Sequence, residues 1–294
     1  MRRALLEIVR HVPGSAQRAL VPPASALFYA ALPEARRAIA GNLDVVMGPA
    51  SALERHRRTY ELFVYYAQSI AYLYSMHSGG SLPVEARFVD LHHFDDARRD
   101  HRGVITITAH LGAWQLMPYL LRSRTHMPPV TMAMAEEPNR ALSDLEKELR
   151  SSFKIIYTTG SPFVLLELQK VLRQGEVVGM QLDRQVGAGY TTLPFFGRPA
   201  SFPLGATMLA RMSGCPIVPI FSAYPDGDRR RVDVTYCEPI FVAHTKDRER
   251  DLREAMEKTT TIYEQWVRRY PTQWFNFYDF WAPPTVAPTP SSPG

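Results

Sequence analysis

The residues that could do chemistry gather after the strand-like segment VITITA (104–109), which runs directly into His110 and the string LGAWQ. In an α/β sheet, the residue just past the carboxyl end of a strand lies in the ligand crevice. Gly112 allows close backbone approach there, and Gln115 falls in the first turn of the next helix, where its side chain can reach back toward His110. Such a histidine is suited to act as a general base on an alcohol. A structural histidine at the strand end is the alternative.

Other catalytic and cofactor motifs are absent from the sequence. It contains no G-x-S-x-G nucleophile elbow, and neither the G-x-x-x-x-G-K-[ST] phosphate loop nor the G-x-G-x-x-G dinucleotide fingerprint occurs. His92 and His93, near Asp95 and Asp96, could bind a metal, but the stretch is polar and helical and we interpret it as a solvated surface. We therefore expect neither a metal nor a cofactor.

Strand-like and helical segments alternate from residue 85 onward. This alternation predicts an α/β fold with a largely parallel sheet and helices on both faces. Strands are expected at 104–109, 130–135, 154–158, 176–182, 191–196, 216–221 and 230–237. Helices are expected near 114–123, 139–151, 162–173, 203–213 and 246–270.

Two further helices are expected upstream, over 34–47 and 51–77. Apolar residues recur along the second helix at intervals of three and four, which indicates one apolar face. This face belongs either to the core or to the wall of a lipid-binding groove. Its residues are Phe63, Tyr66, Ile70, Leu73 and His77.

The net charge of +5 arises entirely in the N-terminal fifth of the chain. Residues 1–60 hold nine arginines, no lysine and four acidic residues, whereas residues 61–294 hold 25 basic and 25 acidic residues. Nucleic-acid-binding surfaces usually mix Lys with Arg around a reading face, and the neutral 61–294 region argues against that class. An arginine-rich stretch with apolar residues between the charges fits an anionic membrane surface better.

Segment 1–32 is the expected membrane contact. No window of 18 residues in it is free of charge and proline, so a spanning helix is not expected. Its short apolar run, interrupted by Glu7, makes a poor signal peptide. We expect an interfacial helix over residues 5–12, followed by a shallow insertion around Leu27–Tyr29. A helix packed on the protein's own core is the alternative.

Three segments therefore organise the chain: the membrane-associating appendage 1–32, one domain over 33–281, and a proline-rich tail over 282–294 that is expected to be disordered. The two cysteines, Cys215 and Cys237, cannot form a disulfide framework. Their scarcity indicates a reducing compartment.

The string TAHLGAWQLMPYLL (108–121) resembles the H-x-x-x-x-[DE] block of glycerolipid acyltransferases. Its form is closest to the lauroyl and myristoyl transferases that act late in lipid A biosynthesis. The resemblance continues in order over residues 30–281, and several weak blocks in the right order are more specific than any one alone. The further blocks are PEARRAIAGNL (33–43), LRQGEVVGMQLDRQ (172–185), LPFFGRPASFPLGATMLARMSGCPIVPIF (193–221) and YPTQWFNFYDFW (270–281).

The resemblance implies an acyltransferase-type α/β fold on the cytoplasmic face of the bacterial inner membrane, bound peripherally and without a cofactor. A fatty acyl chain would pass from acyl carrier protein or acyl-CoA to a hydroxyl of a lipid acceptor. His110 would be the base that removes the hydroxyl proton, and Asp183 carries over from a second motif of the family as a catalytic residue. The implied substrate-binding residues are Arg150, Arg184, Phe196, Gly197 and Arg198.

Gln115 departs from the family, which shows Asp or Glu at that position. Gln115 can accept one hydrogen bond from the imidazole of His110, but it supplies no negative charge to stabilise an imidazolium. Two readings stay open: an active acyltransferase, or a weak or inactive relative that binds lipid or acyl carrier as a scaffold. Lipid A precursors, acylated sugars, phosphoinositol glycolipids and amino-acid lipids all fit as acceptors.

Overall fold

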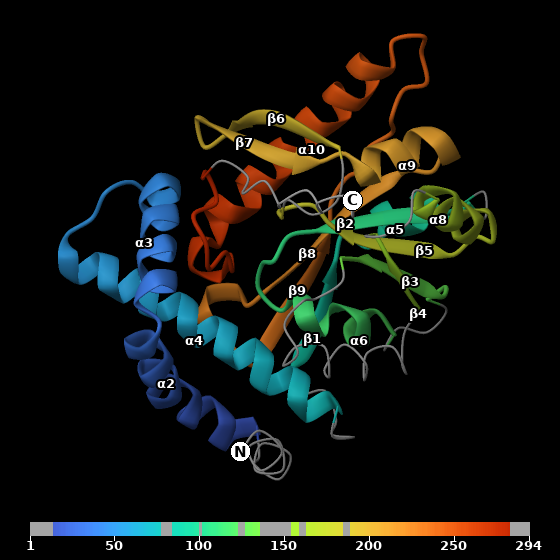
Figure 1. Cartoon of the computed structure of the whole chain (residues 1–294). Helices are drawn as coiled ribbons and strands as arrows, with labels where there is room; N and C mark the ends of the chain where they lie inside the picture. Colours follow the sequence, from blue (N-terminus) through green and yellow to red (C-terminus); the bar gives the residue numbers. More distant parts are fainter. Residues whose placement is uncertain are drawn as a thin grey trace, which may run out of the picture.

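The computed structural model of the chain describes residues 14–77, 84–99, 102–122, 127–135, 154–158, 163–184 and 189–282. Within these residues a seven-stranded sheet occupies the centre of the molecule (Figure 1). In spatial order its strands are β1 (Glu85–Val89), β9 (Arg231–Tyr236), β8 (Ile217–Ala223), β2 (Val104–Thr108), β5 (Val177–Gln181), β3 (Val130–Met134) and β4 (Lys154–Tyr157).

The sheet is mixed but largely parallel, as the alternating sequence pattern predicts. Strands β8, β2, β5, β3 and β4 all run in one direction. Strand β9 runs antiparallel to β8, and β1, at the edge of the sheet, pairs parallel to β9, so these two strands run the other way. The central position of β2 explains its near-continuous run of β-branched residues, because a central parallel strand is buried on both faces.

Helices cover both faces of the sheet (Figure 1). Helices α8 (Val164–Arg173), α9 (Gly205–Ser213) and α10 (Arg248–Arg269) share one hydrophobic core with Ile105 and Ile107 of β2. Helix α4 (Ala52–His77), the 3-10 turn η1 (Trp114–Leu116) and α6 (Met117–Arg122) share the other core with Val104. The short helix α5 (His92–Ala97) joins this second core through Phe94.

One expected strand lies outside the main sheet. The segment expected at 191–196 forms β6 (Tyr190–Phe195), which pairs with β7 (Arg198–Pro203) in a separate antiparallel hairpin against α10. Strand β7 was not expected from the sequence. Phe196 and Gly197 connect the two strands with φ angles of 52° and 73°, as two-residue hairpin turns require. Helix α9 then follows close to its expected position.

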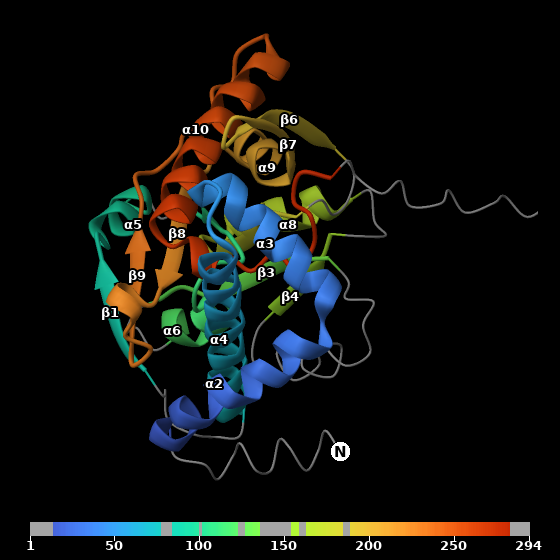
Figure 2. The same ribbon diagram turned by 90° about the vertical axis from the view of Figure 1, so that its left-hand side faces the viewer.

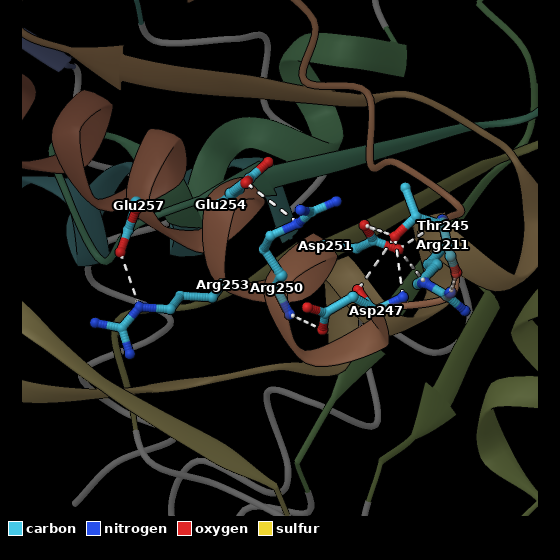
Figure 3. Close-up of polar contacts among 8 residues, drawn as sticks. All are labelled: Arg211, Thr245, Asp247, Arg250, Asp251, Arg253, Glu254 and Glu257. Atoms are coloured by element: carbon cyan, nitrogen blue, oxygen red, sulfur yellow. Dashed lines mark hydrogen bonds and ion pairs between the residues drawn. The ribbon is translucent and has the colours of Figure 1, made fainter.

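Helix α10 is fixed to α9 by a buried carboxylate (Figure 3). Asp251 accepts hydrogen bonds from the Thr245 backbone N–H (2.8 Å) and hydroxyl (2.8 Å), and from Arg211 Nε (3.1 Å). Asp247 caps the helix by accepting the backbone N–H of Arg250 at 3.0 Å. These contacts hold the amino end of α10, whose other end approaches the carboxyl edge of β2.

The N-terminal helices lie outside the sheet, as Figure 2 shows. Helices α2 (Gly14–Ala31) and α3 (Pro33–Met47) both pack on α4, and α3 and α4 confirm the helices expected over 34–47 and 51–77. Among the described helices, none is long and apolar enough to cross a membrane. The interfacial helix expected over 5–12, the helix expected at 139–151 and nearly all of the 282–294 tail lie outside the described residues.

The segment expected to insert shallowly into a membrane divides its side chains between solvent and core. Leu27 and Phe28 on α2 are 73% and 57% exposed. Tyr29 instead packs edge-on against Phe63 and Tyr60 of α4, with ring centroids 5.5 and 5.8 Å apart. Leu27 and Phe28 therefore form an exposed apolar surface on α2, whereas Tyr29 packs between α2 and α4.

Candidate active site

His110 stands at the carboxyl edge of the sheet, two residues beyond the end of β2. The chain must turn sharply there to enter η1, and Gly112 makes the turn with a φ of 62°. A Cβ at this position would overlap the carbonyl oxygen of Ser222 on β8. Only glycine therefore lets the chain pass this close to β8, and the spacing from His110 to Gly112 is fixed by the backbone.

Two other segments hold this turn in place through backbone hydrogen bonds. The Gly112 N–H donates to the Gln273 carbonyl at 2.8 Å, and the Ala113 N–H donates to the Ser222 carbonyl at 2.9 Å. The Phe275 N–H donates to the His110 carbonyl at 2.7 Å. The segment after α10 stood out in the sequence only as one of the blocks of family resemblance. In the structure its backbone hydrogen bonds hold His110 and Gly112 in place.

The partner of the imidazole is Asp183. It lies two residues beyond the end of β5, the strand that pairs with β2. His110 Nδ1 and Asp183 Oδ1 are 2.7 Å apart, and the His110 backbone N–H donates to Asp183 Oδ2 at 2.8 Å. Trp274 Nε1 donates to the same Oδ2 at 3.1 Å. Three donors around one carboxylate assign the Nδ1 proton to His110 and leave its Nε2 as the basic nitrogen.

Burial and charge set the protonation of this pair. His110 and Asp183 are 5% and 2% exposed. Burial lowers the pKa of His110 below its usual value; Asp183 opposes this shift, and the Arg184 guanidinium adds to it. Burial alone would raise the pKa of Asp183, but attraction to His110 and the hydrogen bonds it accepts outweigh burial and leave that pKa below its usual value. At neutral pH the pair is a neutral imidazole held by a carboxylate, which is the state a general base needs.

A cavity of about 250 Å³ lies between the sheet and helices α4 and α6. Neither His110 nor Asp183 lines it, but Trp114, whose ring packs against the His110 imidazole with centroids 4.7 Å apart, does. The lining is mostly apolar. Its polar end lies where β2 and β5 finish, with Thr108, Gln181 and Arg184. The apolar lining includes Ile70, Leu73, Met117, Leu121, Val130 and Met132. Three residues of the apolar face predicted on α4 therefore line a cavity, since Tyr66 joins Ile70 and Leu73 there.

Gln115 lies in the wall of this cavity, and its expected contact with His110 is not formed. Its side chain is 7% exposed, and neither Oε1 nor Nε2 has a hydrogen-bond partner among the described residues. The physical reason is that Asp183 already occupies Nδ1 of His110. The tight turn at Gly112 and the 3-10 geometry of η1, in place of an α-helical first turn, then direct Gln115 toward the cavity.

The predicted substrate-binding residues divide between two places. Arg184 lines the cavity. Phe196, Gly197 and Arg198 form the turn of the β6–β7 hairpin and do not belong to the cavity lining. The Phe196 N–H donates to Glu264 on α10 at 3.1 Å, so this turn is held against α10. Arg150 lies outside the described residues.

The hairpin still connects to the site through an aromatic contact. The Phe195 ring lies 5.9 Å from the Trp274 ring, whose Nε1 donates to Asp183. On the other side, the Tyr263 hydroxyl donates to the Thr108 carbonyl at the end of β2. Sequence reasoning missed Trp274 and Tyr263 as site residues. The dense aromatics of YPTQWFNFYDFW were a signal for Trp274, whereas Tyr263 lies within a long charged helix and had none.

His92 and His93, which we interpreted from the sequence as a solvated surface, lie on α5, and the side chain of His92 is exposed. Within the described part of the chain, no group of three or more His, Cys, Asp and Glu residues is arranged to hold a metal ion.

Fold and site together define a class of protein: a mixed α/β sheet with a buried His–Asp pair at its carboxyl edge, next to a mostly apolar cavity. The model of the bacterial lipid A biosynthesis acyltransferase family matches residues 2–282. The chain therefore belongs to that family, and the acyltransferase resemblance is confirmed.

A solved structure that matches this chain is the 1-acyl-sn-glycerophosphate (LPA) acyltransferase PlsC from Thermotoga maritima. It shares 14% sequence identity, and the match covers 86% of this chain and 97% of that one with a TM-score of 0.41. No curated protein matches the chain significantly.

Proposed function

We propose that this protein moves a fatty acyl chain from an acyl thioester to a hydroxyl of a lipid or glycolipid acceptor, as in lipid A biosynthesis. The observation that carries the proposal is the buried His110–Asp183 pair at the carboxyl edge of the sheet, together with a mostly apolar cavity that is lined by Trp114, the aromatic neighbour of His110. Membership of a lipid A acyltransferase family supports the same chemistry. Acyl carrier protein and acyl-CoA are the proposed donors.

The reaction follows from the free nitrogen of His110. Nε2 removes the proton of the acceptor hydroxyl as its oxygen attacks the thioester carbonyl carbon. The tetrahedral intermediate collapses, the C–S bond breaks, and the imidazolium returns the proton to the leaving thiolate. Asp183 stabilises the imidazolium between these steps and keeps the Nδ1 tautomer. The products are an ester and a free thiol, so protons and electrons balance without a cofactor.

Gln115 was the reason to consider an inactive scaffold, and the geometry weakens that reason. The role that the family motif gives to its Asp or Glu, which is to orient and charge-stabilise the histidine, is available here from Asp183. The scaffold reading would be favoured only if thioester and lipid bind without transfer.

We also propose that the protein binds peripherally to the cytoplasmic face of the inner membrane. Leu20, Leu27 and Phe28 on α2 are more than half exposed, and the net charge of residues 1–60 is +5. Exposed apolar side chains next to basic residues suit insertion into an anionic leaflet. Replacing Leu27 and Phe28 with Asp should lower binding to phosphatidylglycerol vesicles. The control Phe163→Asp changes the residue just before α8, whose side chain is 68% exposed, and should not lower binding. Equal binding by all three proteins would contradict the anchor.

Mass spectrometry of lipids tests the acyl transfer and names the acceptor together. Host cells with and without the gene are compared, and the expected result is one lipid class that loses a single acyl chain when the gene is absent. In vitro, the purified full chain should restore that chain from palmitoyl-CoA or from palmitoyl-acyl carrier protein. An unchanged lipid profile, together with no transfer from either donor, would contradict the proposal.

A further inference from the structure

Two donors from the C-terminal part of the chain reach the His110–Asp183 pair directly. Trp274 Nε1 donates to the Asp183 carboxylate, and the Phe275 N–H donates to the His110 carbonyl. A third donor, the hydroxyl of Tyr263 on α10, contacts the strand that carries His110 instead. Tyr263 is buried, and no step of the proposed reaction uses its hydroxyl. Its place beside the pair therefore needs a separate explanation.

The Tyr263 hydroxyl donates to the carbonyl of Thr108 at 2.5 Å. Thr108 is the last residue of β2 and lies two residues before His110. The same carbonyl accepts the Leu182 N–H at 3.3 Å, and Leu182 directly precedes Asp183. One oxygen atom thus joins the two chain segments that carry the base and its carboxylate, and Tyr263 contributes the shorter of its two hydrogen bonds.

The two strands have little other connection at this point. The paired register of β2 with β5 ends at Thr108 and Gln181. The next bond, from Leu182 to Thr108, is longer than the usual N–H···O distance of about 2.7–3.2 Å. The separation of the two segments beyond it therefore depends on how firmly the Thr108 carbonyl is held.

Helix α10 is a firm support for this hydroxyl. The buried Asp251 accepts hydrogen bonds from Thr245 and Arg211 and so fixes the amino end of the helix (Figure 3). Further along α10, the Tyr263 ring packs edge-on against Phe221 of β8, with centroids 5.3 Å apart. The ring is therefore held between the helix and the sheet, and its hydroxyl stays at the end of β2.

The hydroxyl also keeps its proton over the range in which a histidine titrates. Burial raises the pKa of Tyr263 well above its usual value, and the negative charge of Asp183 raises it further. A protonated phenol remains a donor, so the hydrogen bond to Thr108 does not change with pH in this range.

We propose that Tyr263 is a positioning residue for acyl transfer, because its hydroxyl fixes the Thr108 carbonyl and thereby the distance between His110 and Asp183. This inference rests on the proposed function. The competing explanation is a purely structural hydroxyl that satisfies its own buried hydrogen bond. The two differ in their effect on the rate, because a displacement of about 1 Å can cost about 10²-fold in catalysis.

Tyr263→Phe tests the inference on the full chain, because it removes one oxygen atom and keeps the ring. The matched control is Tyr72→Phe. Tyr72 is also buried, and its hydroxyl donates at 2.8 Å to the carbonyl of Arg229, which lies two residues before β9. Each variant loses one hydrogen bond from a tyrosine hydroxyl to a carbonyl, so thermal melting should show similar small losses of stability.

Proton NMR of the proteins without substrate gives the direct readout. An imidazole Nδ1–H that is bound to a carboxylate resonates far downfield, and His110→Gln identifies the signal by its loss. A looser contact with Asp183 should move this signal upfield, or remove it by faster exchange with water, in Tyr263→Phe. The signal should stay in place in Tyr72→Phe. An unmoved signal in folded Tyr263→Phe overturns the inference.

Kinetics with palmitoyl-CoA or palmitoyl-acyl carrier protein give the second readout. In Tyr263→Phe, kcat should fall by roughly 10- to 50-fold, with KM within about threefold. Asp183 raises the pKa of His110, whereas burial and the Arg184 guanidinium lower it. A looser contact with Asp183 should therefore move the acidic limb of kcat/KM to lower pH. A kcat within about threefold of that of Tyr72→Phe, or an acidic limb that stays in place, makes Tyr263 a structural residue.

These readouts separate the inference from the proposed function. The NMR signal needs no substrate, so a shift in Tyr263→Phe without any transfer by the unmodified protein contradicts acyl transfer and leaves Tyr263 as the residue that holds the pair together. Transfer by the unmodified protein, with equal signals and equal kcat in Tyr263→Phe and Tyr72→Phe, contradicts the inference alone.

Discussion

His110 and Gln115 lie five residues apart on one turn, and their surroundings are opposite. The backbone N–H, the carbonyl and Nδ1 of His110 all have partners, whereas neither polar atom of the Gln115 side chain has one among the described residues. Both residues are buried. The comparison teaches that equal burial does not mean equal support, because the protein holds the imidazole by several hydrogen bonds and leaves the amide with none among the described residues.

The two sides also differ in what they contribute. The His110 side is preorganised by the protein, since Asp183 and the segment after α10 fix the imidazole before any ligand arrives. The Gln115 amide has no such support among the described residues. Preorganised groups lower activation barriers because they need no rearrangement during the reaction, so changes on the His110 side should lower kcat the most.

The largest loss should come from removing the charge on the His110 side. In Asp183→Asn we expect kcat to fall by roughly 10³- to 10⁴-fold, by analogy with the orienting aspartate of serine proteases. Because Asp183 raises the pKa of His110 against burial, its removal should also move the acidic limb of kcat/KM to lower pH. Steady-state rates between pH 5 and 8, over roughly the range in which histidine titrates, measure both effects. A rate within tenfold of that of the unmodified protein would show that Asp183 does not support His110 in catalysis.

A smaller loss is expected when a carboxyl replaces the amide on the Gln115 side. Gln115→Glu places a carboxyl without a hydrogen-bond partner at a buried position on the turn that carries His110, so transfer should fall by roughly 10- to 100-fold. The loss should deepen as pH rises and the new carboxyl ionises. Measured rates that instead rise 5- to 30-fold, on the order of one charge-assisted hydrogen bond, would show that this position acts on the imidazolium.

The smallest effect is expected at Trp274, which supports His110 through its hydrogen bond to Asp183. Trp274→Phe removes one of the donors to Asp183 and should lower kcat by about 5- to 10-fold, equivalent to the net contribution of a typical hydrogen bond. Trp281→Phe is the matched control, because Trp281 Nε1 donates to the Phe195 carbonyl at 3.2 Å and not to Asp183. Equal rates for the two variants would mean that the Trp274 bond is only structural.

The sheet and the position of His110 could be predicted from the sequence because their signals are local. The β-branched run before His110 and the alternation of strands and helices can both be recognised within short segments of the chain. The outcome agrees for the largely parallel sheet, for α3 and α4, and for the position of His110 at the carboxyl edge. The hairpin partner β7 was missed because RPASFP carries no strand periodicity.

The partner of the histidine could not be read from spacing. Gln115 is five residues from His110, whereas Asp183 is 73 residues away and becomes a neighbour only because β2 pairs with β5. The strand order that makes them adjacent depends on long-range packing. The resemblance had pointed to Asp183 as a catalytic residue, and its contact with His110 came only from the three-dimensional arrangement.

Loss of the base tests the central claim most directly. Transfer of radiolabelled palmitate from palmitoyl-CoA or palmitoyl-acyl carrier protein to extracted lipid is measured for His110→Ala and for His110→Gln, which retains a donor for Asp183. Both variants should melt as folded proteins and still bind donor, and transfer should fall by about 10²- to 10⁴-fold. If either folded variant keeps more than about a tenth of the unmodified rate, His110 is not the base.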